Sequence, residues 1–224
     1  MSEEIGVLGE EIDVQETVDR FHKLYYDSDT RTWKNTFWLG VPVQKCPLDL
    51  WIYQEILWKV RPDVIIETGT YDGGSAYFLS HMCDLMGRGR VTTIDIEPRP
   101  NRPQHPRLEY VTGSSTAPEV VSHVKQSLSP SDVVLVILDS DHSEAHVSNE
   151  LQAYWDLVSP GSYLVVEDTN INGNPILPEF GPGAREAVDA FMAGNANFVL
   201  DEEMEKFFMT FNPGGYLRRV TPSG

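Results

Sequence analysis

The clearest fold signal in this chain is Val64-Ile-Ile-Glu-Thr-Gly-Thr-Tyr-Asp-Gly-Gly-Ser75. It begins as a short β-branched run, turns through three glycines and leads into a segment of helical length at 74–86. A strand, a glycine-rich turn and a helix in this order are typical of the first unit of an α/β sheet. The glycines let the backbone approach a ligand closely, and the following helix N-terminus favours an anionic group.

The segments on both sides of this unit continue the alternation of strands and helices. Further strands are predicted at 91–96, 108–111, 132–138, 163–166, 198–200, 207–211 and 216–220. Further helices are predicted at 14–25, 48–60, 118–128, 143–157 and 184–192. The turn Asn212-Pro-Gly-Gly215 predicts that the last two strands form an antiparallel hairpin. This pattern predicts a doubly wound, mostly parallel α/β sheet, in which ligands bind at the carboxyl ends of the strands.

The segment before this alternation predicts an N-terminal helical extension. Apolar residues recur at helical spacing from Val14, Pro47 can open the next helix, and Pro62 ends it. An aromatic loop at 36–45 lies between the two helices. We expect residues 1–62 to form this extension with a loop that covers the substrate, and residues 63–224 to form the ligand-binding domain.

The composition of the chain excludes several classes of protein. The 224 residues carry 17 Lys and Arg against 34 Asp and Glu, a net charge of −17, which disfavours nucleic acid and anionic membranes as partners. Cys46 and Cys83 are too few for a disulfide framework and lack zinc-site spacing. The N-terminus has no secretory pattern, and the longest apolar run, Val133–Leu138, is far too short to span a membrane. We therefore expect a cytoplasmic protein.

The turn after the first strand favours one class of nucleotide-containing ligand over another. Tyr71 stands where the dinucleotide fingerprint needs its second glycine, which disfavours an NAD-dependent enzyme. Glu67 would repel a phosphate but suits a cationic amine, such as that of S-adenosylmethionine. Asp95, with Glu97 as second choice, can accept the two hydroxyls of a ribose. Ser114, after the next strand, can lie beside an adenine.

Acidic residues crowd the ends of two later strands, in Asp139-Ser-Asp-His142 and Glu167-Asp-Thr169. Neighbouring carboxylates repel one another unless a cation or a proton joins them, and Mg²⁺ prefers oxygen ligands. This predicts a Mg²⁺ site. His142 could take a proton from a substrate hydroxyl, or it could simply bond a carboxylate at a helix start. A zinc pair of His142 and His146 is poorly supported, because the E-x-x-H chemistry is missing.

Several motifs together carry a family resemblance. They are Trp38-Leu-Gly-Val-Pro-Val-Gln-Lys-Cys-Pro-Leu-Asp-Leu-Trp-Ile-Tyr-Gln-Glu55, Glu67-Thr-Gly69, Asp139-Ser-Asp-His142, Glu167-Asp-Thr169 and Phe211-Asn-Pro213. With these motifs the chain resembles the cephalosporin hydroxylase-like family, which includes rhamnosyl and macrolide-sugar O-methyltransferases. The resemblance runs from about residue 38 to 219.

The resemblance implies a seven-stranded, Rossmann-like class I methyltransferase fold that uses S-adenosylmethionine and Mg²⁺. It assigns the metal to Asp139, Glu167 and Asp168, with Asp141 as a substitute for Asp139. It assigns the catalytic base to His142, beside Asp139. The residues expected to bind the donor are Glu67, Gly69, Thr70, Tyr71, Gly73, Ser75, Asp95, Ser114 and Asp139.

The function expected on these grounds is Mg²⁺-dependent transfer of a methyl group to a hydroxyl of a small molecule. A deoxysugar of the rhamnosyl type or a glycosylated natural product is the expected acceptor, and a homo-oligomer the expected assembly. Two alternatives remain. One is a binding protein with the same fold and no activity. The other is a hydroxylase, as the family name suggests, although Asp141-His142 has the wrong order for an iron triad.

Overall fold

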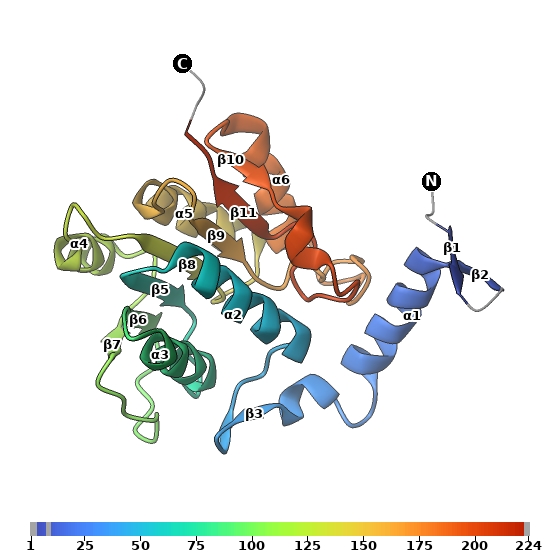
Figure 1. Cartoon of the computed structure of the whole chain (residues 1–224), viewed down its shortest axis with the longest axis horizontal. Coiled ribbons are helices and arrows are strands. Elements are labelled where there is room, and N and C mark those ends of the chain that lie inside the picture. The colour runs from blue at the N-terminus through green and yellow to red at the C-terminus, as the bar shows by residue number, and fades with distance from the viewer. Residues whose placement is uncertain (1–3, 8–9, 222–224) are drawn as a thin grey trace.

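A computed structural model describes residues 4–7 and 10–221 of the chain. Its centre is a seven-stranded sheet with the order β10-β11-β9-β8-β5-β6-β7 (Figure 1). The strands are β5 (Val64–Thr68), β6 (Arg90–Asp95), β7 (Leu108–Thr112), β8 (Val134–Leu138), β9 (Tyr163–Val166), β10 (Phe198–Leu200) and β11 (Tyr216–Arg219). All neighbouring pairs from β9 to β7 are parallel, whereas β11 runs antiparallel to both β9 and β10. The predicted fold class is confirmed.

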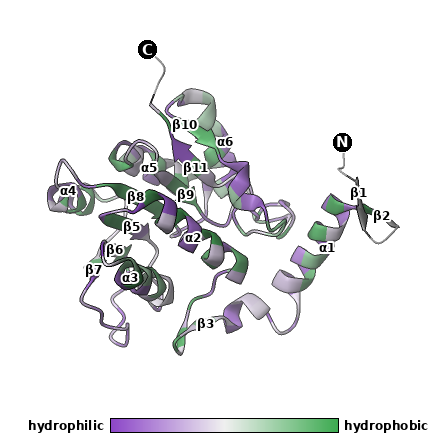
Figure 2. Cartoon of the chain, in the orientation of Figure 1, coloured by the Kyte–Doolittle hydropathy of each residue, from purple (hydrophilic) through white to green (hydrophobic). Residues whose placement is uncertain are grey.

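The central strands are buried on both faces of the sheet. Every residue of β5 and β8 is buried, as expected for parallel strands that helices cover from both sides. Because side chains alternate along a strand, Val64 and Ile66 enter one core while Ile65 enters the other. Figure 2 shows the inner strands as largely hydrophobic, in contrast to the loops around them.

Helices form one layer on each face of the sheet. Helices α4 (Pro118–Ser127), α5 (Glu144–Tyr154) and α6 (Ala184–Gly194) pack into one core. Helices α2 (Pro47–Val60) and α3 (Gly74–Met86) pack into the other. Pro47 is the first residue of α2, where the amide hydrogen that proline lacks would have no partner within the helix. Helix α3 is capped at its C-terminus by Gly87, which takes the left-handed conformation at φ 70°. The helices and strands therefore leave the carboxyl ends of the parallel strands free for loops.

The N-terminal helix α1 (Val14–Asp27) lies at the edge of the molecule, away from the two helix layers (Figure 1). Asp13 caps it by accepting a hydrogen bond from the Glu16 amide at 3.0 Å. Its Tyr25 and Tyr26 pack against Phe211. The remaining small elements are β1 (Glu4–Val7), β2 (Glu10–Asp13), β3 (Phe37–Trp38), β4 (Val41–Pro42) and the 3-10 turns Thr32–Asn35, Trp155–Leu157 and Glu202–Glu205.

The predicted strand at 207–211 is wrong. β11 already pairs with β9 on one edge and β10 on the other, so no edge remains for this segment. Its backbone groups bond to local turns and to one side chain instead, since the Phe208 amide donates to the Glu205 carbonyl and the Phe211 amide donates to Asp49 Oδ2, both at 2.9 Å. The antiparallel pair at the C-terminus is thus β10 with β11, and 207–211 becomes a loop that reaches the site described below.

No helix in the described part of the chain is both long enough and apolar enough to cross a membrane.

Candidate active site

A cavity of about 790 Å³ lies at the carboxyl ends of the parallel strands. The loops that follow five strands line it, with Gly69–Asp72 after β5, Asp95–Glu97 after β6, Gly113–Ser115 after β7, Asp139–His142 after β8 and Asp168 after β9. Its volume falls in the range of small-molecule sites. This is the position that the sequence predicted for a ligand.

The glycine-rich turn after β5 packs directly against the loop after β8. Gly69 has φ 83°, and a Cβ atom there would lie 1.7 Å from the Asp139 carbonyl oxygen. The next residues reverse the chain, since the Gly73 amide donates to the Thr70 carbonyl at 2.8 Å. Tyr71 takes the left-handed conformation at φ 47°, which an L-residue adopts only when its surroundings hold it there. The turn is therefore a rigid wall of the cavity.

Most of the expected donor residues share this cavity. Those that line it are Gly69, Thr70, Tyr71, Ser75, Asp95, Ser114 and Asp139. Glu67, in β5, and Gly73, at the end of the turn, are not among the residues that line it. The Tyr71 ring also carries the Arg99 guanidinium 3.9 Å from its centroid, a contact that the sequence did not predict.

Glu67 is a fully buried carboxylate beneath the turn. The Thr93 hydroxyl donates to its Oε2 atom at 2.6 Å, while its Oε1 atom finds no hydrogen-bond partner among residues 4–7 and 10–221. Burial raises the pKa of Glu67 to about 7, although the nearby Lys45 opposes this shift. A buried carboxylate oxygen without a partner suits a cationic or hydrogen-bond-donating ligand group.

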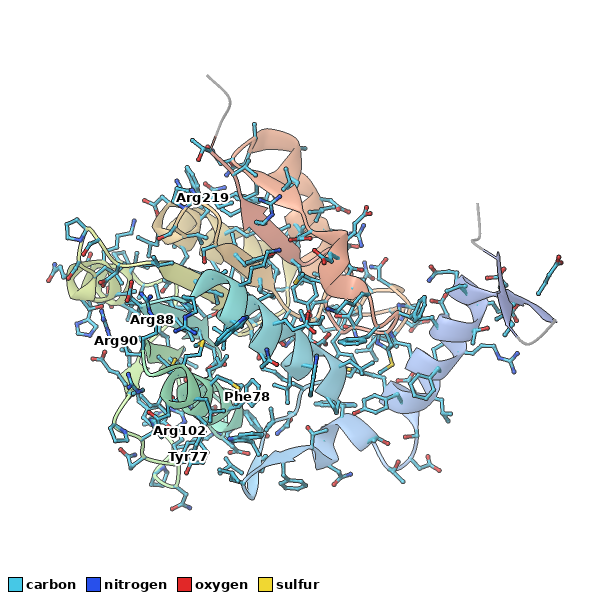
Figure 3. The ribbon with its side chains drawn as sticks, viewed as in Figure 1. Tyr77, Phe78, Arg88, Arg90, Arg102 and Arg219 are labelled. Carbon is cyan, nitrogen blue, oxygen red and sulfur yellow. The ribbon has the colours of Figure 1, made fainter. Side chains whose placement is uncertain are left out.

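Asp95 is fixed by the protein from both sides. Its Oδ1 atom accepts the Glu97 amide at 2.8 Å, and its Oδ2 atom accepts the Tyr71 amide at 2.7 Å. Arg102, labelled below α3 in Figure 3, pairs with the same Oδ2 atom at 3.0 Å and donates to the Tyr71 carbonyl at 2.8 Å. The carboxylate therefore has a set orientation at the end of β6, and sequence reasoning missed the arginine that helps to set it.

Three side chains at the ends of β8 and β9 can hold a metal ion. Asp139, His142 and Asp168 each offer one ligand atom, and these atoms all lie within 4.8 Å of one another. His142 Nε2 lies 3.2 Å from Asp168 Oδ2. Asp168 is held at φ 54°, and its amide donates to Asn212 Oδ1 at 3.1 Å. The Phe211-Asn-Pro213 segment thus aims the Asp168 carboxylate at the cluster.

Lys45 is a buried cation beside this cluster that sequence reasoning did not single out. Its Nζ atom lies 2.6 Å from Asp139 Oδ2 and 2.5 Å from Glu167 Oε1, and its side chain is 4% exposed. The Tyr53 hydroxyl also donates to Glu167 Oε1, at 2.5 Å. The structure therefore brings Asp139 and Asp168 together with His142, whereas the Glu167 carboxylate is engaged by Lys45 and Tyr53. The one available signal was the basic residue within the motif at 38–55.

Burial dominates the electrostatics of these groups. It raises the pKa of Asp139, Glu167 and Asp168 above their ordinary values, partly offset by Lys45 and, at Asp168, by His142. Burial acts to lower the pKa of His142, but the carboxylates of Asp168 and Asp139 outweigh it and the pKa rises. Three carboxylates therefore share one lysine and one imidazole, a balance that leaves negative charge for a further cation.

Asp141 and His146, the other candidates in this region, have different partners. Asp141 Oδ1 accepts the amide of Ser143 at 2.8 Å and its hydroxyl at 2.5 Å. These bonds lower the pKa of Asp141. His146 lines the cavity but pairs with Ser115 at 3.2 Å and with Glu150 at 3.5 Å. The structure thus places Asp139, rather than Asp141, in the cluster.

Aromatic and aliphatic side chains line the same cavity as the carboxylates. Tyr26 and Trp33 stack with ring centroids 5.2 Å apart and line the cavity together with Ile171, Leu177, Phe180 and Phe211. Phe37 is 58% exposed, and Trp38 packs edge-on against Phe78 at 5.0 Å. Of the aromatic residues in the N-terminal loop, Trp33 therefore reaches the cavity, while Trp38 packs between the extension and the core.

The family model "Rhamnosyl O-methyltransferase/CmcI" matches residues 30–220. A rhamnosyl O-methyltransferase of Mycobacterium tuberculosis is 39% identical over 210 residues, which cover 90% of this chain and 84% of the relative.

Among solved structures, an apo structure of CmcI has a TM-score of 0.65 at 24% identity and covers 84% of this chain and 77% of that chain. A structure of CmcI described with Mg and S-adenosylmethionine has a TM-score of 0.63 at 23% identity and covers 84% and 78%. At these identities the two structures support the fold.

Proposed function

Because the chain belongs to the rhamnosyl O-methyltransferase/CmcI family, we propose that it methylates a hydroxyl of a deoxysugar or of a glycosylated natural product with the help of Mg²⁺. As a member of this family, the chain is an S-adenosylmethionine-dependent O-methyltransferase. One observation carries the rest of the proposal. A single cavity is lined both by the turn after β5 and by Asp139, His142 and Asp168.

The donor half of this cavity fits S-adenosylmethionine. Gly69 lets the turn after β5 pack against the loop after β8, because a Cβ atom there would strike the Asp139 carbonyl. Glu67 is not among the residues that line the cavity, and its Oε1 atom, which has no partner among the described residues, would attract the amine of the donor from beneath this turn. Asp95 would accept the ribose hydroxyls, and Ser114 would lie beside the adenine. Thr70, Tyr71, Gly73 and Ser75 complete the proposed donor site.

Asp139 and Asp168 would hold the metal, and we retain Glu167 as the third proposed ligand, shared with Lys45. Hard carboxylate oxygens of this kind suit Mg²⁺. A bound ion would supply the positive charge that orients an acceptor hydroxyl and lowers its pKa. His142 would take the proton of that hydroxyl, and its Nε2 atom lies 3.2 Å from Asp168 Oδ2. Asp168 keeps the imidazole oriented, because its own backbone is fixed by Asn212.

The acceptor half of the cavity supports a sugar with apolar character. Tyr26, Trp33 and Phe180 line the cavity, and the carbon-bound hydrogens of a pyranose would pack against such aromatic side chains. A deoxysugar has fewer hydroxyls to satisfy against these side chains. We further propose that residues 1–62 cover the acceptor and that residues 63–224 hold the donor, in a cytoplasmic homo-oligomer.

The proposal is tested by mixing the protein with labelled S-adenosylmethionine, Mg²⁺ and a panel of rhamnosides and macrolide glycosides. We expect label in a rhamnosyl-type glycoside, and none when Asp139→Asn replaces the wild type. Binding of S-adenosylhomocysteine without label in any glycoside would instead favour a silent binding protein. Transfer to non-sugar phenols alone would contradict the acceptor class.

A further inference from the structure

Lys45 occupies the space between two of the proposed metal ligands. Its ammonium group contacts Asp139 Oδ2 at 2.6 Å and Glu167 Oε1 at 2.5 Å, so both contacts are short, charge-assisted hydrogen bonds. A cation placed between these two oxygens would meet Lys45 in the same volume. Lys45 and the proposed metal ion would therefore use the same pair of carboxylates, Asp139 and Glu167.

The chain builds this contact from the segment that leads into α2. Gln44 takes the left-handed conformation at φ 57°, and Pro47 begins the helix two residues after Lys45. Tyr53, farther along α2, reaches the same Glu167 oxygen with its hydroxyl at 2.5 Å. Lys45 is thus anchored by a rigid helix start and is not a flexible surface side chain.

Burial strengthens the effect of the Lys45 charge on the groups around it. A lysine that is 4% exposed has lost its hydration, so it must be paired, and its carboxylate partners would be left unpaired without it. The charged groups that face it are Asp139, Glu167 and Glu67. In such an environment a unit charge a few Å from a second cation repels it far more strongly than it would in water.

We propose that Lys45 is a positioning residue that holds Asp139 and Glu167 in place in the absence of metal and competes with the divalent cation for both. This inference rests on the metal site of the proposed function. It predicts that the natural site binds its ion more weakly than the carboxylates alone would allow. It also predicts that the metal-free protein depends on Lys45 for stability.

The test measures binding of Mn²⁺, alone and without donor or acceptor, by calorimetry and by the electron paramagnetic resonance signal of free Mn²⁺. In Lys45→Met, which keeps the length and loses the charge, we expect the Kd for Mn²⁺ to fall by about tenfold or more. Without metal, the variant should melt at a lower temperature than the wild type. Mn²⁺ should raise the Tm of the variant by more than it raises the Tm of the wild type. In a Glu167→Gln background the gain in affinity should shrink, because one of the released carboxylates is gone.

Lys59→Met is the matched control. Lys59 is 51% exposed and lies 3.8 Å from Asp201, outside the cavity lining, so its loss should leave the Kd for Mn²⁺ unchanged. If Lys45→Met does not fold without metal, Lys45→Gln is measured in its place, and a tighter Kd is again expected.

The outcomes separate this inference from the proposed function. Wild-type protein that binds Mn²⁺, loses that binding in Asp168→Asn, but shows an unchanged or weaker Kd in the Lys45 variants would overturn the role of Lys45 alone. Wild-type protein that binds no Mn²⁺ at millimolar concentration would overturn both the metal site and this inference.

Discussion

Replacing Gly69 with alanine should damage stability and donor binding together. Gly69 has φ 83°, and the new Cβ atom would lie 1.7 Å from the Asp139 carbonyl oxygen, 2.5 Å from its carbonyl carbon and 2.9 Å from the Ser140 Cα. All three contacts are backbone atoms of the loop after β8, so no side chain can rotate away. The loops after β5 and β8 must separate instead.

The magnitude follows from two separate effects. An L-residue in the left-handed region is disfavoured by about 1–2 kcal/mol, and overpacking that forces backbone shifts costs about 1–3 kcal/mol. Their sum is about 2–5 kcal/mol of unfolding free energy. The separation also moves Asp139, so the site loses both its donor wall and one proposed metal ligand.

Gly87→Ala is the matched control, because Gly87 has φ 70° and a Cβ there would meet nothing within 4 Å. Only the conformational effect of about 1–2 kcal/mol applies to it. Urea denaturation should therefore show a larger loss for Gly69→Ala than for Gly87→Ala, and only Gly69→Ala should lose the rise in Tm that S-adenosylhomocysteine produces. Equal losses in the two variants, with donor binding kept in both, would refute the close approach of the two loops.

The remaining predictions concern the site and its surroundings. Asp95→Ala should weaken the binding of S-adenosylhomocysteine by about 1.5–3 kcal/mol, as measured by calorimetry, because the ribose hydroxyls lose a charged acceptor. An unchanged affinity would remove Asp95 from the donor site. Exhaustive chelation should abolish turnover, Mg²⁺ should restore it, and Asp168→Asn should need more Mg²⁺ in a kinetic titration; full activity without metal would make the cluster structural. His142→Ala should lower kcat by about 10²–10⁴-fold with donor affinity retained, whereas His146→Ala should change kcat only a few-fold; a near-normal kcat in His142→Ala would assign the proton to another group. Burial lowers the pKa of His22 to about 4. The unfolded chain therefore binds the extra proton first, and unfolding free energy should fall by up to about 3 kcal/mol as the pH drops from about 6.5 to about 4. In urea denaturation, the unfolding free energy of His22→Gln should fall less over this pH range than that of the wild type. An equal fall in the two proteins would show that His22 is not the cause.

The regular part of the fold was predictable because it depends on local patterns. The β5 segment begins with the β-branched run Val64–Ile66, the β8 segment is apolar through its length, and the predicted helix at 74–86 coincides with α3. The prediction of a strand at 207–211 was wrong because the conformation of this segment depends on residues far away in the sequence. Phe207–Phe211 has a strand-like composition, but β9 and β10 occupy both edges of β11, and no local pattern contains that information.

The candidate site divides in the same way. Residues at strand ends could be proposed because the carboxyl ends of parallel strands meet at one edge, and Asp95, Asp139 and Asp168 all line the cavity. Lys45 and Arg102 arrive from loops whose paths the pattern does not define. Both were found only through their contacts, at 2.6 Å to Asp139 and 3.0 Å to Asp95.

The two missed cations have a common physical role. This chain has a net charge of −17 and places several carboxylates at one edge of the sheet. Burial of each of these carboxylates raises the free energy of its charged form. Arg102 pairs with Asp95, and Lys45 pairs with both Asp139 and Glu167. The orientations of Asp95, Asp139 and Glu167 are therefore fixed by the chain's own side chains. An acidic site built in this way needs scarce basic residues at defined places, so in such a chain a buried lysine or arginine beside a strand end is itself a signal of function.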